Sequence, residues 1–381
     1  MSGFDHIVLC VFLYLLFYLY DRSLIKKRKD SIIYKKLCII FFVFVEGLRY
    51  GRGRDFFHYG ESYLHYAIEK SNQPLYQFFQ SVLHEFDFTL SFLPYGALFI
   101  VLSLLFILCF FKFSELFKDK VFCFCLLGIL ATQYIFEWTI RQGLSFALLL
   151  LAWFYFENRQ WKKALIYMLI GFFMHYGNAF FLLLMFFCYF FLSNKPVSIK
   201  ISLPLLVIVT FVLNADNFLP YVQILISSLN VNFLGEGFSH YVTNSSRWFS
   251  DASILEDMRR GLTTTIITTL FYASTIIIGY YNHKTSNKWT YIYNAYVLSL
   301  LIYVPFYLVE LVSRIFFPAT VLWFIPVALC LYNIPVRKSP FLLRCSYIVL
   351  ILYLFAYYGR FVFFNPIGSY IWSQQPQSNY L

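Results

Sequence analysis

Charge is scarce in this sequence. Only 13% of its 381 residues are Asp, Glu, Lys or Arg, whereas a soluble domain carries about a quarter. A chain with only about half the usual proportion of charged residues cannot form the water-exposed surface of a soluble protein of this length. Apolar residues make up 60% of the chain and come in long runs, which is typical of membrane spans. The sequence therefore predicts an all-α polytopic integral membrane protein. It excludes a soluble enzyme, a nucleic-acid-binding protein and a disulfide-stapled secreted module.

Metal-binding and disulfide-forming patterns are also lacking. The eight cysteines fall in or beside apolar runs, and Cys123-Phe-Cys125 lacks the ligand spacing of a zinc finger. We therefore expect core or lipid-facing thiols, and neither a metal nor another cofactor. Residues 1–20 have no positive n-region and no small-residue cleavage site, so we expect a retained first span rather than a signal peptide.

Twelve apolar runs predict twelve transmembrane helices, although several are shorter than the ~20 residues of a perpendicular span. The pair 164–175 and 178–193 can also be interpreted as one long interrupted segment. The predicted helices are 4–20, 33–48, 92–111, 121–136, 143–157, 164–175, 178–193, 201–213, 262–281, 290–308, 315–332 and 341–358.

The connections between these helices alternate between two sides that differ in charge. One set holds 20 of the 30 Lys and Arg and five of the 19 acids, whereas the opposite set, with both termini, holds ten basic residues and 13 acids. An excess of Lys and Arg marks the cytoplasmic face, so we expect both termini to face outward. The cytoplasmic set consists of 21–36, 112–120, 157–163, 193–200, 282–288 and 333–344.

The outward side prefers arginine over lysine. It holds nine Arg and one Lys, whereas the cytoplasmic connections hold 15 Lys and five Arg. Arginine offers a planar, permanently charged fork that pairs bidentately with phosphate oxygens, so this bias predicts an anion site. Ion pairs with outward acids are the alternative. The nine are Arg49, Arg52, Arg54, Arg141, Arg247, Arg259, Arg260, Arg314 and Arg360.

We predict a single transmembrane domain over 1–381, with the outward stretches 49–91 and 214–261 covering the active site. In the first stretch, glycines flank Arg52 and give a flexible turn where the backbone can approach a ligand. Its later part, 62–87, mixes aromatic and polar residues in the manner of an interfacial segment. The second stretch is interpreted as a lid, because long loops are often functional; an unspecialised connection is the alternative.

Charged residues at the outward ends of predicted spans are candidates for function. Glu137 and Arg141 stand four residues apart, as do Glu310 and Arg314. In helical register such pairs can form local salt bridges. The functional interpretation places Arg141 at the floor of an outward cavity, and it makes Arg314 a second cation of the same anion pocket.

His175 ends the sixth predicted span at the same depth as Arg141 and begins a polar break, His175-Tyr-Gly-Asn178. A neutral imidazole there could accept a proton from a hydroxyl group. A hydrogen-bonded structural histidine is the alternative.

An ordered set of elements resembles the EpsG-type polysaccharide polymerases, which are relatives in function of the Wzy O-antigen polymerases. Ile140-Arg141-Gln142 begins an Ala/Leu-rich span, and a late arginine precedes an aromatic-rich span. Arg54 departs from the small or hydroxyl residue that is usual at its position in the family. The matching elements, in chain order, are Arg49, Gly53, Asp55, Tyr59, Ile140-Arg141-Gln142, His175 and Arg314.

The resemblance implies a GT-C-like outward cavity in a bacterial inner membrane, and a metal-independent polymerase. Such enzymes transfer a glycan from undecaprenyl diphosphate to another lipid-linked repeat, building O-antigen, capsule or exopolysaccharide. Donor, acceptor and membrane lipid are then partners, a chain-length regulator protein is a candidate, and nucleic acid is not one. The implied roles are diphosphate binding by Arg141 and Arg314, phosphate orientation by Arg49 and Arg54, substrate contact by Gln142 and Tyr59, and deprotonation by His175 or Asp55.

Three other classes remain open from the sequence. An O-antigen ligase shares the substrate and typically has a His and an Arg in a large outward loop late in the chain. His240 and Arg247 in 214–261 match that pattern, so a ligase remains an alternative. A lipid-linked oligosaccharide flippase would have charges accessible from both faces, whereas the arginine bias here is confined to one. A scaffold or secondary transporter is the third, although matched halves with broken helices are not evident.

Overall fold

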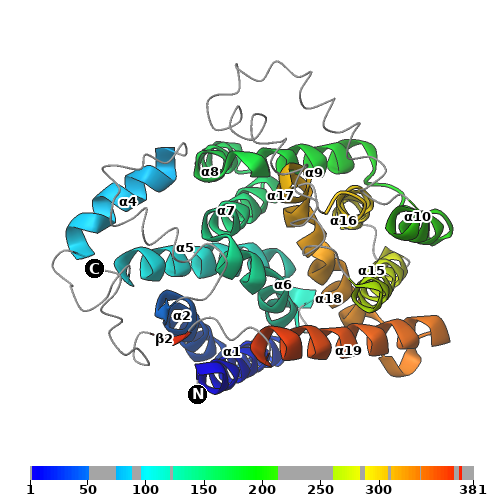
Figure 1. Cartoon of the computed structure of the whole chain (residues 1–381), viewed down its shortest axis with the longest axis horizontal. Helices are drawn as coiled ribbons and strands as arrows, with labels where there is room; N and C mark the ends of the chain where they lie inside the picture. Colours follow the sequence, from blue (N-terminus) through cyan, green and yellow to red (C-terminus); the bar gives the residue numbers. More distant parts are fainter. Residues whose placement is uncertain are drawn as a thin grey trace, which may run out of the picture. The chain divides into compact units, whose positions relative to one another are not determined.

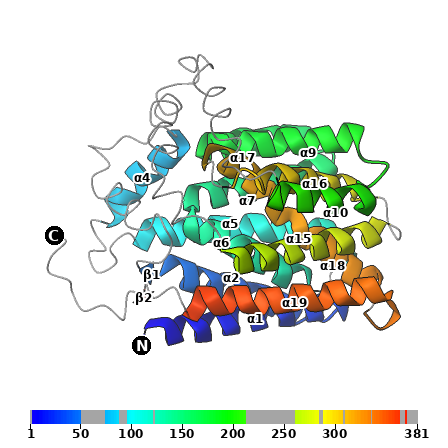
Figure 2. The same ribbon diagram turned by 45° about the vertical axis from the view of Figure 1, so that its right-hand side comes forward.

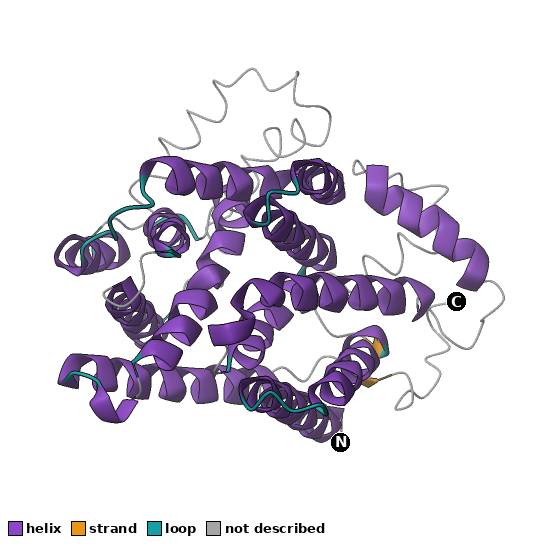
Figure 3. Cartoon of the chain, turned by 180° about the vertical axis from the view of Figure 1, so that it is seen from behind, coloured by secondary structure: helices purple, strands orange, loops and turns teal. Residues whose placement is uncertain are grey.

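The computed structural model describes residues 2–50, 74–87, 96–120, 123–212, 261–283, 288–307, 310–334, 336–363 and 369–370. This part of the chain is almost entirely helical, with strand confined to one short pair (Figure 3). It forms two compact units, Met1–Ala179 with Phe355–Leu381, and Phe180–Leu354. The single transmembrane domain over 1–381 stays a prediction.

The first unit contains most of the predicted site. Its elements are α1 (Ser2–Ile25), α2 (Ser31–Gly47), β1 (Arg49–Tyr50), α4 (Pro74–Asp87), α5 (Gly96–Ser114), η1 (Glu115–Lys120), α6 (Phe124–Trp138), α7 (Ile140–Glu157), α8 (Trp161–Met174), η2 (Tyr176–Asn178) and β2 (Ser369–Tyr370).

The second unit holds the later helices. Its elements are α9 (Ala179–Phe191), α10 (Ile199–Phe211), α15 (Leu262–His283), α16 (Thr290–Tyr303), α17 (Glu310–Thr320), η4 (Val321–Trp323), α18 (Phe324–Asn333), η5 (Val336–Lys338) and α19 (Phe341–Phe363), which continues into the first unit.

Four described segments are long and apolar enough to cross a membrane: Val8–Ile25, Leu98–Phe117, Leu262–His283 and Ile315–Asn333. Shorter apolar helical segments are Phe124–Glu137, Tyr176–Phe191, Ile199–Phe211 and Phe341–Ala356, the last being part of the longer helix α19. All twelve predicted ranges coincide with helices, and the helical class is confirmed. Twelve complete crossings stay a prediction.

In the first unit, α1, α2, α5 and α6 pack against one another, and α7 packs between α5 and α8 (Figure 1). Phe42, Phe106 and Phe136 form an aromatic core between α2, α5 and α6, with ring centroids 4.6 to 6.0 Å apart. At the other end of α6, the buried Asp21 carboxylate accepts hydrogen bonds from the backbone N–H groups of Cys125 and Leu126 at 3.2 and 3.0 Å. Asp21 thereby caps α6 from a different helix, which satisfies two of its orphan donors.

Strand β1, which follows α2, pairs antiparallel with β2, which follows α19. Arg49 lies opposite Tyr370 and Tyr50 opposite Ser369. The backbone that carries Arg49 is therefore joined to the segment that follows α19 (Figure 2).

In the second unit, Asn294 joins α16 to the connection between α9 and α10. Its amide is fully buried; it donates to the carbonyls of Leu192 and Lys195 at 2.6 and 2.8 Å and accepts from the N–H of Val197 at 2.8 Å. The Asn294 side chain thus forms hydrogen bonds with two backbone carbonyls and one backbone N–H at the end of α9 and in the connection to α10.

We expect Asn294→Ala to destabilise the protein, because each buried polar group left without a partner costs about 1–3 kcal/mol. The measurement is thermal unfolding of the purified protein in detergent. Asn158→Ala is the matched control, since Asn158 is exposed and bonds only a carbonyl of its own helix, at 2.8 Å. Equal unfolding temperatures for the two variants would contradict a stabilising role for the Asn294 hydrogen bonds.

The predicted helix over 315–332 lies in a continuous helical segment that is long enough to cross a membrane, Ile315–Asn333. The segment is divided into α17, η4 and α18. Pro326 has no N–H to donate to the carbonyl of Leu322, four residues earlier, which favours the tighter 3-10 turn η4 before α18. Pro318 lies inside α17, which continues past it to Thr320.

All eight cysteines are free thiols; six are buried, and Cys123 and Cys345 are half-buried. Some of them contact polar groups: Cys10 Sγ lies 3.5 Å from His6 Nδ1, and Cys330 Sγ accepts a hydrogen bond from the Tyr347 hydroxyl at 3.3 Å.

Candidate active site

The candidate site is built around the tight junction between α6 and α7. Thr139 alone separates the two helices, and its carbonyl accepts the N–H of Gly143 at 2.8 Å. A Cβ placed on Gly143 would lie 2.6 Å from the Cα of Phe136, a distance real Cβ atoms essentially never show. Glycine is therefore required for the close approach of the two helix ends.

This junction corrects two expectations. Helix α7 begins at Ile140 rather than at 143, so Arg141 and Gln142 lie in its first turn. Glu137 belongs to α6 and Arg141 to α7, so the i,i+4 geometry of one continuous helix does not apply to them. The break at Thr139 is the physical reason.

Arg141 is half-buried, and its guanidinium carbon lies 5.1 Å from the centre of the Tyr76 ring. Tyr76 lies in α4, is fully buried, and lies one helical turn before the buried Gln80. A guanidinium over a tyrosine face is an attractive cation–π arrangement. Helix α4 therefore contacts the guanidinium of Arg141 through the Tyr76 ring.

Arg141 brings positive charge to the first turn of α7, whereas the C-terminus of α6 and the buried Glu137 bring negative charge to the same junction. The free N–H groups at a helix N-terminus carry roughly half a positive charge, and the guanidinium adds a full one. A cation is not itself stabilised there by the helix dipole, whereas an anion is attracted by both charges. The arrangement suits the binding of a phosphate or diphosphate.

His175 follows α8 in an extended conformation, with φ −159° and ψ 105°, and its side chain is half-buried. Its imidazole lies against Gly177: a Cβ at 177 would stand 2.9 Å from Cε1 and 3.2 Å from Nδ1. Glycine at 177 lets the ring lie over the polar break, and any larger residue would push it away.

Gln142 and Asn178 connect Arg141 with His175. The Asn178 amide donates to the Gln142 carbonyl at 3.0 Å, and the Gln142 amide donates to Asn178 Oδ1 at 3.4 Å. Both side chains are buried, and Ser145 continues the link from α7 by donating to the Gly171 carbonyl at 2.6 Å. Gln142 was predicted to contact substrate; in this structure its amide binds Asn178 and joins the two candidate residues.

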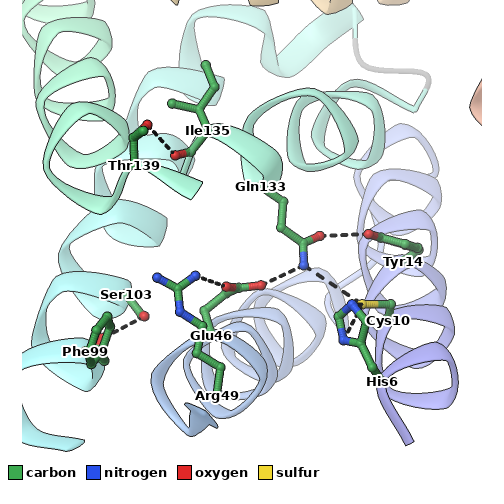
Figure 4. Close-up of polar contacts among 10 residues, drawn as sticks. All are labelled: His6, Cys10, Tyr14, Glu46, Arg49, Phe99, Ser103, Gln133, Ile135 and Thr139. Carbon is green, nitrogen blue, oxygen red and sulfur yellow. Dashed lines mark hydrogen bonds and ion pairs between the residues drawn. The ribbon is translucent and has the colours of Figure 1, made fainter. Parts of the chain in front are cut away.

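Arg49 lies in β1, two residues after the end of α2, and is only 2% exposed. Its Nη1 donates to Glu46 Oε2 at 3.0 Å, and its guanidinium carbon lies 5.2 Å from the Phe99 ring centre and 5.6 Å from that of Phe136 (Figure 4). Because Phe136 packs on Gly143, Arg49 and Arg141 belong to the same end of the first unit. That the two guanidinium groups meet in one anion pocket stays a prediction.

The remaining candidates are less fully described. Arg314 and Glu310 lie one turn apart in α17 of the second unit, and the structure describes their backbone only. Other predicted residues lie outside the described residues, namely Asp55, Arg54, Tyr59, Arg52, His240, Arg247, Arg259 and Arg260.

Sequence reasoning missed Tyr76, Glu46 and Gln133 as parts of this region. For Tyr76 a signal existed: Pro74 is suited to a first helical position, and Tyr76 and Gln80 then share one face of a helix. Glu46 and Gln133 were recognisable only as polar residues inside apolar runs. Among the described residues, no group of three or more His, Cys, Asp and Glu side chains could hold a metal ion.

Comparison with known protein families matches residues 32–373 to the EpsG family. Comparison with curated proteins and with solved structures gives no match. The family match covers nearly the whole chain, including every predicted site residue.

Proposed function

This chain belongs to the EpsG family, and from that premise we propose that it is a polysaccharide polymerase of the bacterial inner membrane. Its substrates are oligosaccharide repeat units linked to undecaprenyl diphosphate, and its product is a surface polysaccharide. The family membership and the apolar helices make it a membrane protein with a role in polysaccharide biosynthesis.

The proposed reaction is a glycosyl transfer between two lipid-linked glycans. A hydroxyl group on the terminal sugar of the acceptor attacks the anomeric carbon of the donor. The bond between that carbon and the diphosphate oxygen breaks, and undecaprenyl diphosphate leaves with the bonding electrons. The hydroxyl proton passes to a base. The glycosyl–diphosphate bond supplies the driving force, so no nucleotide is consumed.

The single observation that carries this proposal is the position of Arg141 in the first turn of α7, beside Tyr76. Negative charge grows on the diphosphate as the bond breaks. A fixed guanidinium and a helix N-terminus in a site of low dielectric stabilise that charge in the transition state. This is the task that a divalent metal performs in many other phosphate-leaving reactions.

We assign the further roles as follows. Arg141 binds the diphosphate, with Arg314 as the second cation and Arg54 orienting a phosphate. His175 is the first candidate for the base, because the Gln142–Asn178 link places it at the same end of the unit as Arg141. Asp55 is the second candidate, and Tyr59 contacts substrate.

The proposed topology places this site on the outer face of the membrane. Contacts within each unit fit that assignment, because residues predicted to be cytoplasmic contact one another. Lys35 and Lys112 both pair with Glu115, at 3.9 and 2.6 Å, and Asn282 accepts a hydrogen bond from Asn333 at 3.0 Å.

Reconstitution tests the proposal. Purified protein in liposomes, supplied with undecaprenyl-diphosphate-linked repeats alone, is expected to produce a ladder of glycan lengths on a gel, and EDTA is expected to leave the rate unchanged. A product transferred only to lipid A core would identify a ligase. Movement of the substrate across the bilayer without bond formation would identify a flippase. Either outcome, or a requirement for a divalent cation, would contradict the proposal.

A further inference from the structure

Polar side chains form a hydrogen-bonded network next to the candidate site. Tyr14 of α1 donates to Gln133 Oε1 at 2.8 Å, and Gln133 Nε2 donates to Glu46 Oε1 at 2.6 Å. The other carboxylate oxygen of Glu46 accepts from Arg49 at 3.0 Å. Glu46 is fully buried, and Gln133 is 3% exposed. Figure 4 shows Gln133 lying between the α1 side chains and Glu46.

Further contacts connect Arg49 with the first turn of α7. Its guanidinium lies against the Phe136 ring, and the Phe136 backbone is the surface on which Gly143 packs. Arg141 lies two residues before Gly143 in the first turn of α7. Contacts therefore lead from α1, through α6 and α2, to the turn that carries Arg141.

Stability alone is a weak reason for such a network. Burying an ion pair costs desolvation that the attraction between the charges often only just repays, so a well-packed apolar pair would frequently serve as well. Ionisable groups within a membrane protein are accordingly rare, and they are generally functional. What the network does provide is fixed geometry, since one oxygen of the Glu46 carboxylate accepts from Gln133 of α6 and the other from Arg49 of β1.

Resting on the proposed function, we propose that Glu46, Gln133 and Arg49 are positioning residues for Arg141. Arg49, with one Nη donating to Glu46 and two rings against its guanidinium, acts here as a brace rather than as a ligand of the diphosphate. The network fixes the outward ends of α2 and α6, and through Phe136 it fixes the first turn of α7. A displacement of that turn by about 1 Å is enough to lower a rate by roughly 10²-fold.

The test is a double-mutant cycle that leaves the ion pair intact. Gln133→Met keeps the length of the side chain and removes the donor to Glu46. We expect it to lower kcat about tenfold, with KM within about threefold of wild type. In the Arg141→Lys background the same change is expected to lower kcat by less than about twofold, since residues that act through one another are not additive. Equal effects in both backgrounds would overturn the proposal, and so would wild-type kcat in Gln133→Met.

A second readout does not depend on catalysis. Phenylglyoxal modifies accessible arginines, and mass spectrometry reads the rate at Arg141. Gln133→Met is expected to change that rate several-fold, and Tyr14→Phe, which removes one hydroxyl, is expected to change it less. If Arg141→Lys has no measurable activity, this labelling decides the question. An unchanged rate at Arg141 in both variants would overturn the positioning role.

Ser103→Ala is the matched control. Ser103 is also fully buried, but its hydroxyl donates only to the Phe99 carbonyl of its own helix, at 2.6 Å. Its kcat and its labelling rate are expected to equal those of wild type. Different results contradict the proposed function and this inference. If the wild-type protein makes no polymer, the proposed function is wrong. If the wild-type protein makes polymer but Gln133→Met changes neither kcat nor the labelling rate, only the positioning role is wrong.

Discussion

Arg141→Lys is expected to abolish long-chain glycan in cells that carry it as their only copy, leaving single repeats on lipid. Lysine keeps the charge but loses the planar fork that binds two phosphate oxygens at once. Its compact ammonium group also stacks less well than a guanidinium on the Tyr76 ring that now faces Arg141. Loss of one preorganised charge-stabilising donor costs roughly 10²–10³ in kcat, and polymerisation repeats that loss at every cycle.

The measurements are the glycan length profile on a gel and the amount of protein in the membrane. Arg159→Lys is the matched control, because Arg159 is exposed at the opposite end of α7. It is expected to give normal chain lengths. Normal chain lengths from a well-expressed Arg141→Lys protein would remove Arg141 from the site.

Gly143→Ala is expected to have an effect of similar size by a different route. A Cβ at this position would stand 2.6 Å from the Cα and 3.0 Å from the backbone N of Phe136. Backbone cannot rotate away as a side chain can, so the α6–α7 junction must open. Overpacking of this kind costs about 1–3 kcal/mol or more. Arg141, two residues away, would move with the first turn of α7.

We therefore expect Gly143→Ala to lower both the unfolding temperature in detergent and the polymerisation rate of the protein that still folds. Gly261→Ala is the control, since a Cβ there would meet nothing within 4 Å. Its effect is expected to stay within about 0.5 kcal/mol. A Gly143→Ala protein with wild-type stability and rate would show that the junction is less tight than the structure indicates.

The helices of this protein were largely predictable from its sequence, because long apolar runs specify them strongly. Boundaries shifted where local chemistry overrode hydrophobicity. At Thr139 one residue ends α6 and supplies the first carbonyl of α7, which moved the start of α7 to Ile140. Before Pro326, which lacks a backbone donor, the 3-10 turn η4 separates α17 from α18 within a segment of continuous hydropathy.

The candidate site was predictable only where one short segment carries it. Arg141 and His175 stand out as polar groups at the ends of apolar runs. The partners that hold them do not, because such partners are tertiary. Gln133 and Glu46 are separated by 87 residues, and Tyr76 reaches Arg141 only once α4 has packed. Strands of two residues, such as β1 and β2, carry no periodic pattern that could be detected.

The pairing of β1 with β2 has a topological consequence. Backbone hydrogen bonds cannot form through a lipid bilayer, so Tyr50 and Ser369, which are paired, must share one compartment. Whatever stretch of polypeptide enters the bilayer after Tyr50 has returned to the starting side by Ser369, and the number of crossings between them must be even. Any arrangement with an odd number is excluded, and reporters inserted next to the two strands should give the same signal whichever way the protein is oriented.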